Sequence, residues 1–309
     1  MKTPQVVFAS SLLPLLLLGC DAAPPPGAHV DSFRVLAEQA DKPYAHPGET
    51  VQLSSLSFDP LGRAVTWAWA SCVNPSQNDL EGCINKLNEA ADPAGAVFAM
   101  GDGMNAPELT IPADAISSLP VAARGAASVG VVSAACPGDF SLGDGPGGLP
   151  FRCQETGTGR ELGLHELIVG IKRITVREND RNQNPEIASV TFDGADWPAA
   201  EVKQVGACAR SDFDYAACAA SDKHQLAAVL TPASFEAGQD ELGRSFTEQV
   251  VIQYYATDGI FEDEVRVGRE PQNGWVARTS ASGQTLNLWF VARDDRGGVS
   301  WATRQVKVQ

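Results

Sequence analysis

The sequence has few basic residues, and this shortage excludes one class of partner. Lysine and arginine together number 23 against 38 acidic residues, which gives a net charge of −15 at pH 7. Nucleic-acid binding draws its affinity from clustered basic side chains, so we expect no nucleic-acid partner. The acidic balance also disfavours docking on anionic lipid headgroups, and its simplest consequence is solubility.

Zinc-binding patterns are missing as well. The sequence contains no CxxC pair. The histidines are scattered along the chain, at His29, His46, His165 and His224. The stretch "HELIV" at His165 lacks the second histidine of a zinc-protease helix. Because zinc ligands come in characteristic spacings, we expect no zinc site.

Catalytic motifs are equally scarce. No GxSxG elbow occurs. The stretch "GDGPGG" (143–148) matches GxGxxG in spacing, but Pro146 interrupts it and no strand-to-helix unit surrounds it. Glu262 and Glu264 form a carboxylate pair, for which a surface hairpin is the favoured interpretation over a glycosidase. The sequence therefore predicts a protein that is not an enzyme and has no catalytic residue or resident cofactor.

Long helical patterns are also rare. Only residues 79–92 carry leucine and isoleucine near helical spacing, and a glycine weakens the pattern. Short segments with alternating apolar and polar residues are frequent, for example "AVTWAWASC" (64–72), "EQVVIQYYATDG" (248–259) and "TLNLWFVARDD" (285–295). Turn residues separate these segments. The sequence therefore predicts an all-β protein built of antiparallel sandwiches.

Cysteine is present at seven positions, and six of them form close pairs. Several connectivities are open to six cysteines. Spacing favours the pairs Cys72–Cys83, Cys136–Cys153 and Cys208–Cys218. Each such loop contributes about 3 kcal/mol by restricting the unfolded chain. Three disulfides indicate an oxidising compartment.

The seventh cysteine ends a segment typical of export signals. A positive end, Met1-Lys2, precedes an apolar stretch (5–19) that is shorter than the roughly 20 residues of a membrane-spanning helix. The stretch "LLGC", Leu17 to Cys20, resembles the lipobox of bacterial lipoproteins. This resemblance implies that residues 1–19 are a signal peptide and that Cys20 carries diacylglycerol. We then expect an exported protein that its acyl chains anchor to the cell envelope, at the outer membrane or at the periplasmic face of the inner membrane. Plain secretion is the alternative.

Proline-rich and polar stretches predict how the mature chain is divided. Residues 20–29 are a proline-rich spacer behind the lipid anchor. The all-polar run "NDRNQNP" (179–185) is expected to link a first domain (30–178) to a second (186–309).

Two stretches resemble bacterial immunoglobulin-like domains of the PKD and cadherin-like type. "HPGETVQLSSLSFDPLGRAVTWAW", His46 to Trp69, resembles the opening half of such a domain. "LWFVARDDRGGVSWATRQVKV", Leu288 to Val308, resembles the last hairpin. The resemblance implies two tandem immunoglobulin-like β-sandwiches. Since each half exceeds the roughly 100 residues of a plain domain, the disulfide-closed loops are expected to be insertions.

The linker raises calcium as a candidate ligand. Glu178, Asp180 and Asn182 resemble the oxygen ligands between cadherin domains. Calcium takes roughly six to eight oxygens, which is more than this run offers. A solvated hinge is therefore the favoured interpretation, with calcium as the alternative.

Four of the six tryptophans divide into two sets. Trp67 and Trp289 lie in alternating strand patterns, where core packing is expected. Trp197 and Trp275 lie in turn-like surroundings, "DGADWP" and "QNGW", where we expect exposure. Exposed tryptophan beside Asp or Asn is typical of a sugar-binding surface, so both are candidate ligand residues.

Three functions remain open at this point. The favoured one is a non-enzymatic envelope lipoprotein that acts as a structural spacer or as a protein-binding or adhesion module, with an envelope protein or polysaccharide as partner. A carbohydrate-binding lipoprotein that uses Trp197 and Trp275 is the first alternative. An accessory hydrolase with an unrecognised site is the second.

Overall fold

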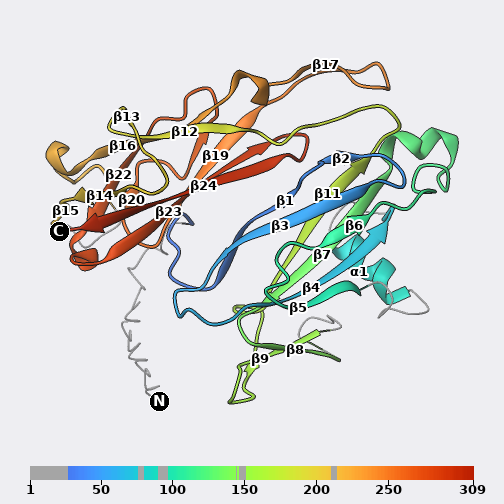
Figure 1. Ribbon diagram of the computed structural model, residues 1–309, viewed down its shortest axis with the longest axis horizontal. Coiled ribbons are helices and arrows are strands. Elements are labelled where there is room, and N and C mark those ends of the chain that lie inside the picture. The colour runs from blue at the N-terminus through green and yellow to red at the C-terminus, as the bar shows by residue number, and fades with distance from the viewer. Residues whose placement is uncertain (1–26, 76–79, 90–96, 144, 146–150, 210–213) are drawn as a thin grey trace, which may run out of the picture.

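The computed structural model describes residues 27–75, 80–89, 97–143, 145, 151–209 and 214–309. Strands predominate, as the alternating patterns predict, and the β-rich class is confirmed. Figure 1 shows the strands in two assemblies that lie side by side. We call β1 to β11 the first group and β12 to β24 the second group.

The first group contains two larger sheets that share one core. The three-stranded sheet has the order β1 (Arg34–Ala40), β3 (Thr50–Phe58) and β6 (Glu108–Thr110). The five-stranded sheet has the order β2 (Tyr44–Ala45), β11 (Ile168–Val176), β7 (Ser128–Cys136), β4 (Thr66–Val73) and β5 (Val97–Asp102). Trp67 and Trp69 of β4 stack with ring centroids 5.5 Å apart and pack in this core with Leu53 of β3.

Two disulfides hold smaller elements to the first group. Cys72–Cys83 joins β4 to the helix α1 (Leu80–Glu89), and Cys136–Cys153 joins β7 to β9. The small sheet on this side has the order β10 (Glu161–Leu162), β9 (Phe151–Gln154) and β8 (Asp139–Leu142). Both disulfide-closed loops are therefore additions to the two main sheets.

The second group repeats the two-sheet plan. One sheet has the order β13 (Ala195–Asp196), β12 (Ile187–Phe192), β16 (His224–Leu230), β22 (Asn273–Arg278) and β15 (Ala207–Cys208), with β20 (Ile260–Phe261) also paired to β22. The other has the order β14 (Val202–Val205), β24 (Val299–Val308), β23 (Thr285–Asp294), β19 (Val250–Ala256) and β21 (Val265–Val267). Alternate residues of β19 are buried, as a strand with one face on a core requires. The third disulfide, Cys208–Cys218, lies beside this core.

The two groups meet along an apolar interface that we call the seam. Leu36 and Ala37 of β1 are buried there against Trp289 and Val291 of β23 and Val299 of β24. Figure 1 shows β1 beside β24. A register shift in the pairing of β1 with β3 lies at this point, and a bulge of this kind re-aims the neighbouring side chains. The seam therefore removes large apolar side chains of both groups from water.

Within the described residues, the named strands of each group pair only with strands of the same group. The segment before β1 departs from this rule. Val30 donates to the Ala256 carbonyl, and the Ala256 amide donates to the Ala28 carbonyl. β21 pairs with β19 only up to Gln253. Beyond this point, residues 28–30 lie along the edge of β19 and pair with the backbone of Ala256. The end of the predicted spacer thus lies against the second group.

The polar run 179–185 is hydrogen-bonded to both groups. The side chain of Asn184 donates to the Ala40 carbonyl of β1 (2.8 Å) and accepts from the Val299 amide of β24 (2.8 Å). The carbonyl of Arg181 accepts from Arg296 in the turn after β23. The favoured interpretation of this run as a solvated hinge is wrong, because its polar groups satisfy backbone groups on either side of the seam.

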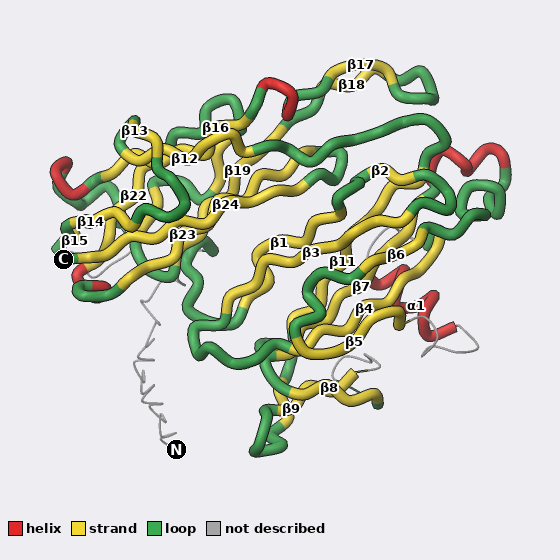
Figure 2. Tube along the Cα trace, in the orientation of Figure 1, coloured by secondary structure: helices red, strands yellow, loops and turns green. Residues whose placement is uncertain are grey.

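A hairpin of the second group reaches the first group as well. It consists of β17 (Ala237–Gln239) and β18 (Ser245–Thr247), and Figure 2 shows it extending along the top of the molecule. Near its tip, the Glu241 amide donates to Asp180 Oδ2 (2.8 Å), and the Glu241 carboxylate faces Arg177 (3.7 Å). The groups are thus joined by the seam, the polar run and this hairpin.

Candidate functional site

The cysteine predictions have two outcomes. Cys20 lies outside the described residues. The three close pairs all form disulfides, with Cα–Cα distances of 5.6 to 5.7 Å, so the predicted connectivity is confirmed for Cys72–Cys83, Cys136–Cys153 and Cys208–Cys218. Each bridge closes a loop within one group and none crosses the seam.

Of the three predicted calcium ligands, Asp180 and Asn182 contact protein groups. Asp180 Oδ2 accepts from the Glu241 amide, and the Asn182 side chain donates to Asp294 Oδ2 (3.5 Å). Glu178 is exposed. In the part of the chain that the structure describes, no three His, Cys, Asp or Glu side chains gather as a metal site. Asp180 and Asn182 therefore help to join the chain at the linker.

The predicted ligand surface at Trp197 and Trp275 is wrong. Both side chains are fully buried, at 0% exposure. Trp197 lies just after β13, where its amide donates to the Val190 carbonyl and turns the ring onto Phe192, at 5.2 Å between centroids. Its Nε1 donates to the Glu201 carbonyl (2.9 Å), so the ring has both apolar cover and a polar partner. The turn residues around it misled the sequence prediction.

The predicted burial of Trp67 and Trp289 is confirmed. Trp67 is 2% exposed in the core of the first group. Trp289 is 3% exposed, but it packs with Val30 and Leu36 in the seam. Trp289 is thus buried between the two groups, and not inside one sandwich as expected.

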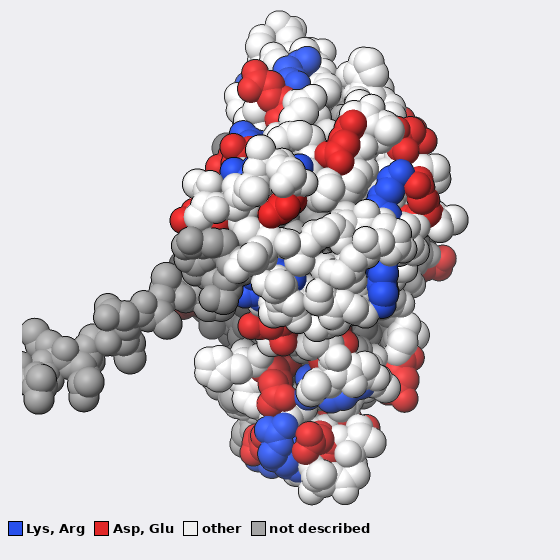
Figure 3. All heavy atoms as spheres, turned by 90° about the vertical axis from the view of Figure 1, so that its left-hand side faces the viewer, with Lys and Arg blue, Asp and Glu red and all other residues white. Residues whose placement is uncertain are grey.

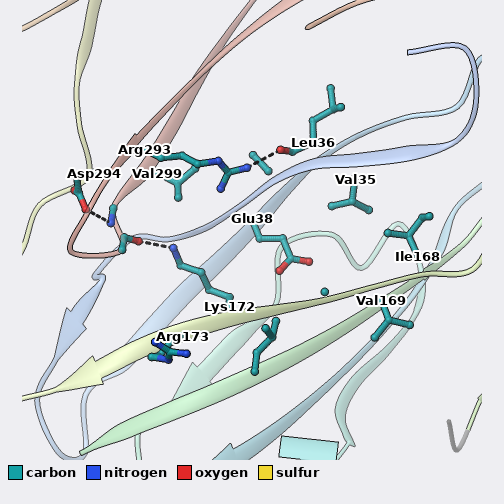
Figure 4. Close-up of a pocket in the computed structure, with 15 residues that line it drawn as sticks. Val35, Leu36, Glu38, Ile168, Val169, Lys172, Arg173, Arg293, Asp294 and Val299 are labelled. Carbon is teal, nitrogen blue, oxygen red and sulfur yellow. Dashed lines mark hydrogen bonds between the residues drawn. The ribbon is translucent and has the colours of Figure 1, made fainter. Parts of the chain in front are cut away.

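A cavity of about 410 Å³ lies where β1, β11 and the turn after β23 meet. This volume falls in the range of roughly 300 to 1,000 Å³ that small-molecule sites occupy. β1 and β11 belong to different sheets of the first group, and the turn belongs to the second. Figure 4 shows the side chains that line it. Interfaces between packed units are common places for ligand sites.

Glu38 of β1 lies in the middle of this cavity. Ser133 of β7 donates a short hydrogen bond to its Oε1. Gly170 of β11 makes room for it, because a Cβ atom at position 170 would lie 3.2 Å from Glu38 Oε1 and 3.1 Å from Ser133 Oγ. Burial is the main cause that raises the pKa of Glu38, and it outweighs the opposing effects of Ser133 and Lys172. The carboxyl therefore takes up a proton more readily than an exposed glutamate.

Lys172 of β11 supplies an ammonium group at one end of the cavity. The residue is only 7% exposed, and its Nζ donates to the Gly297 carbonyl (2.5 Å). Burial, together with a smaller effect of nearby Arg293, lowers the pKa of Lys172 to about 8, against weaker opposing effects of Asp294 and Glu38. A substantial fraction of the Lys172 side chain is therefore still protonated near neutral pH.

The end of β23 and the turn after it position the other charged groups at this end of the cavity. Arg293 donates through Nη2 to the Leu36 carbonyl (2.8 Å) and through Nε to Gln253 Oε1 (2.7 Å). Asp294 Oδ1 accepts from the Gly298 amide (2.7 Å). This turn presents the Gly297 carbonyl to Lys172, and its φ of +99° at Gly297 is one that glycine adopts without strain.

The arrangement is suited to binding rather than to acyl transfer. Ser133 is 2% exposed beneath Glu38, so a substrate carbonyl has no approach to its hydroxyl. Among the described residues, neither Glu38 nor Lys172 has an opposite charge within salt-bridge distance. A buried charge without a partner is energetically costly, and a bound counter-charge relieves this cost.

Sequence reasoning missed these residues because no short motif contains them. One signal was available. Lys172 shares its strand face with Ile174 and Val176, which are both buried, so a lysine occupies an inward position. A charged residue in the buried phase of a strand is a candidate functional residue.

Comparisons with known proteins do not assign the chain to a family. No protein-family model and no curated protein matches it. Among solved structures, it is similar to a nucleoside hydrolase-related hypothetical protein from Saccharophagus degradans that is associated with carbohydrate metabolism, at 13% identity and a TM-score of 0.25. That match covers 44% of this chain and 28% of the other.

A second match is dimeric latent PorU from Porphyromonas gingivalis, at 12% identity and a TM-score of 0.21. It covers 90% of this chain and 24% of the other. The chain thus spans about a quarter of the length of these structures, and TM-scores this low carry no argument about fold or function.

Proposed function

We propose that the chain is a non-enzymatic lipoprotein of the bacterial cell envelope that acts as a rigid spacer or protein-binding module. In this proposal residues 1–19 are removed on export, Cys20 carries the lipid, and residues 20–29 connect it to the folded part. The stretch "LLGC" supports the anchor, and three disulfides fit an oxidising compartment outside the cytoplasm.

The sheet order supports an immunoglobulin-like assignment for both groups. Each group has two sheets around one core, and in each a short early strand pairs in parallel with the last strand. These strands are β2 with β11 in the first group and β14 with β24 in the second. Together with the antiparallel pairing of the other main strands, this plan fits two tandem sandwiches, at residues 30–178 and 186–309.

The seam is the single observation that carries the spacer role. Linked domains usually move relative to one another unless their interface is large and apolar. Here Leu36, Trp289 and Val299 bury apolar surface between the groups, and Asn184 bonds to both. A module joined in this way holds a fixed shape.

The surface charge is consistent with a protein partner. On the face shown in Figure 3, acidic and basic side chains are interspersed, and no large area of one sign is visible. Such a face offers no electrostatic track for a polyanion.

Affinity purification tests this function. The acylated protein, extracted from envelopes with detergent, serves as bait after brief chemical cross-linking. The proposal predicts one recurrent envelope protein in near-equal amount with the bait, also recovered with the unlipidated Cys20→Ala variant when both are soluble. Recovery of polysaccharide alone, or of turnover products from an envelope substrate, would contradict it.

A further inference from the structure

The cavity between β1, β11 and the turn after β23 has a charged end and an apolar end. Figure 4 shows Lys172 and Arg293 at one end, and Val35 and Ile168 at the other. Glu38 lies between the two ends. A cavity of this form distinguishes the two ends of a small ligand.

The charged end is positive although the protein as a whole is strongly negative. Two cationic side chains, those of Lys172 and Arg293, line it together with the carboxyls of Glu38 and Asp294. Asp294 accepts hydrogen bonds from the Arg296 and Gly298 amides, so its charge is engaged within its own turn. Two cationic groups, Lys172 and Arg293, thus face one remaining carboxyl, that of Glu38, whose neutral form is favoured by burial.

Lys172 has free donor capacity toward the cavity. An ammonium group has three N–H donors, and in the structure one of them bonds to the Gly297 carbonyl. The ion is buried and lacks an ionic partner within the described residues. A carboxylate placed here would gain charge-assisted hydrogen bonds and relieve the cost of the buried charge.

We propose that this cavity binds a small amphiphilic carboxylate, with the carboxylate on Lys172 and the apolar body against Val35 and Ile168. This role goes beyond that of a spacer or protein-binding module. It makes the seam the place where a small acid from the envelope is held.

Two other occupants fit the geometry less well. An extended peptide would have to pass between β1 and β11, but the Glu38 side chain crosses that gap to reach Ser133. An amine would be drawn to Glu38 but would meet Lys172 and Arg293 in the same cavity. The volume of about 410 Å³ also suits a single small molecule.

Binding of hexanoate tests the proposal, with 1-hexanol and hexylamine as probes of the same length. The full mature protein is titrated by calorimetry and by ¹⁵N-labelled NMR at neutral pH and millimolar ligand. Hexanoate should bind and shift amide signals of β1, β11 and residues 293–299, whereas 1-hexanol and hexylamine should bind at least roughly tenfold more weakly.

Two variants make the result specific. Lys172→Met should weaken hexanoate binding by roughly tenfold or more, because the charge is lost while the buried methylene chain is kept. Lys307→Met is the matched control, since Lys307 also donates to a glycine carbonyl, that of Gly283, but lies outside the cavity. Lys307→Met should bind hexanoate as the wild type does. Absence of hexanoate binding, equal binding by Lys172→Met, or tighter binding of hexylamine would overturn the proposal.

Proton uptake provides a second readout. The charged groups that face Lys172 are Glu38 from β1, and Arg293 and Asp294 from the end of β23. A bound carboxylate stabilises the protonated form of Lys172, so binding above pH 8 should take up protons. Calorimetry in two buffers of different ionisation enthalpy measures this uptake, and hexanoate binding without it would contradict the assigned contact.

Discussion

The ammonium group of Lys172 in β11 donates a hydrogen bond to the carbonyl of Gly297, 2.5 Å away in the turn after β23. This contact crosses from one group of strands to the other. It places a buried cation at the junction that also includes Arg293 and Asp294. The stability of the protein and the chemistry of its cavity therefore depend on the same side chain.

Stability should rise with pH in the alkaline range because of Lys172. Its pKa is about 8 in the folded protein, whereas an unperturbed lysine side chain has a pKa of 10.5. Between these values the unfolded chain holds the proton that the folded chain has lost, so raising the pH favours the folded state. The contribution is at most about 1.4 kcal/mol per pH unit. Lys172→Met should remove it from urea-unfolding curves measured between pH 8 and 10.5.

Lys307→Met is the control for this measurement and should leave the pH dependence unchanged. A Lys172→Met protein with the same alkaline slope as the wild type would show that Lys172 titrates as an exposed lysine.

Asn184→Ala should loosen the junction of the two groups. The substitution removes hydrogen bonds to the Ala40 carbonyl and from the Val299 amide. Each hydrogen bond contributes about 1 kcal/mol, and its removal leaves a partly buried backbone group unpaired. We therefore expect a loss of about 2 kcal/mol in the free energy of unfolding. Gln183→Ala, at the exposed neighbouring position, should change it by less than about 0.5 kcal/mol. Equal effects of the two variants would mean that the polar run does not join the groups.

Trp197→Ala should behave as a core substitution. The ring is fully buried against Phe192 and Phe290. We expect a loss of about 3 to 5 kcal/mol, measured by chemical denaturation, because the truncation leaves a cavity. Val121→Ala, at a 78% exposed apolar residue, should stay within about 0.5 kcal/mol of the wild type. A folded Trp197→Ala protein of unchanged stability would restore the surface interpretation.

The disulfide between Cys72 and Cys83 should hold α1 to its sheet. Its sulfur atoms lie against Gly130 of β7, where a Cβ atom would come within 2.8 Å of Cys72 Sγ. The double variant Cys72→Ser/Cys83→Ser should lose about 3 kcal/mol of stability and be cleaved faster within α1. Cys20→Ala should leave both properties unchanged. Non-reducing peptide mapping provides the check, and a bridge between Cys83 and Cys208 would contradict the connectivity.

Local patterns were sufficient to predict many strands and all three disulfides. The stretch "TLNLWFVARDD" becomes β23, and α1 lies inside the one weak helical pattern at 79–92. Strand alternation and short cystine loops depend on residues that are neighbours in sequence, which is why they can be read before the fold is known.

The cavity could not be predicted in the same way. Glu38 and Ser133 are 95 residues apart, and Lys172 and Gly297 are 125 apart. Their meeting depends on how two sheets and two groups pack, which no local pattern contains. Trp197 shows the same limit, because its turn-like sequence is local whereas its burial comes from Phe290 in a distant strand.

Mass spectrometry of the N-terminal peptide, from protein extracted from envelopes with detergent, tests the central claim most directly. We expect a peptide that begins at Cys20, with the mass of a diacylglycerol on its thiol, and loss of this species in Cys20→Ala. An unmodified N-terminus at any residue other than Cys20 would contradict the lipid anchor and the envelope function built on it.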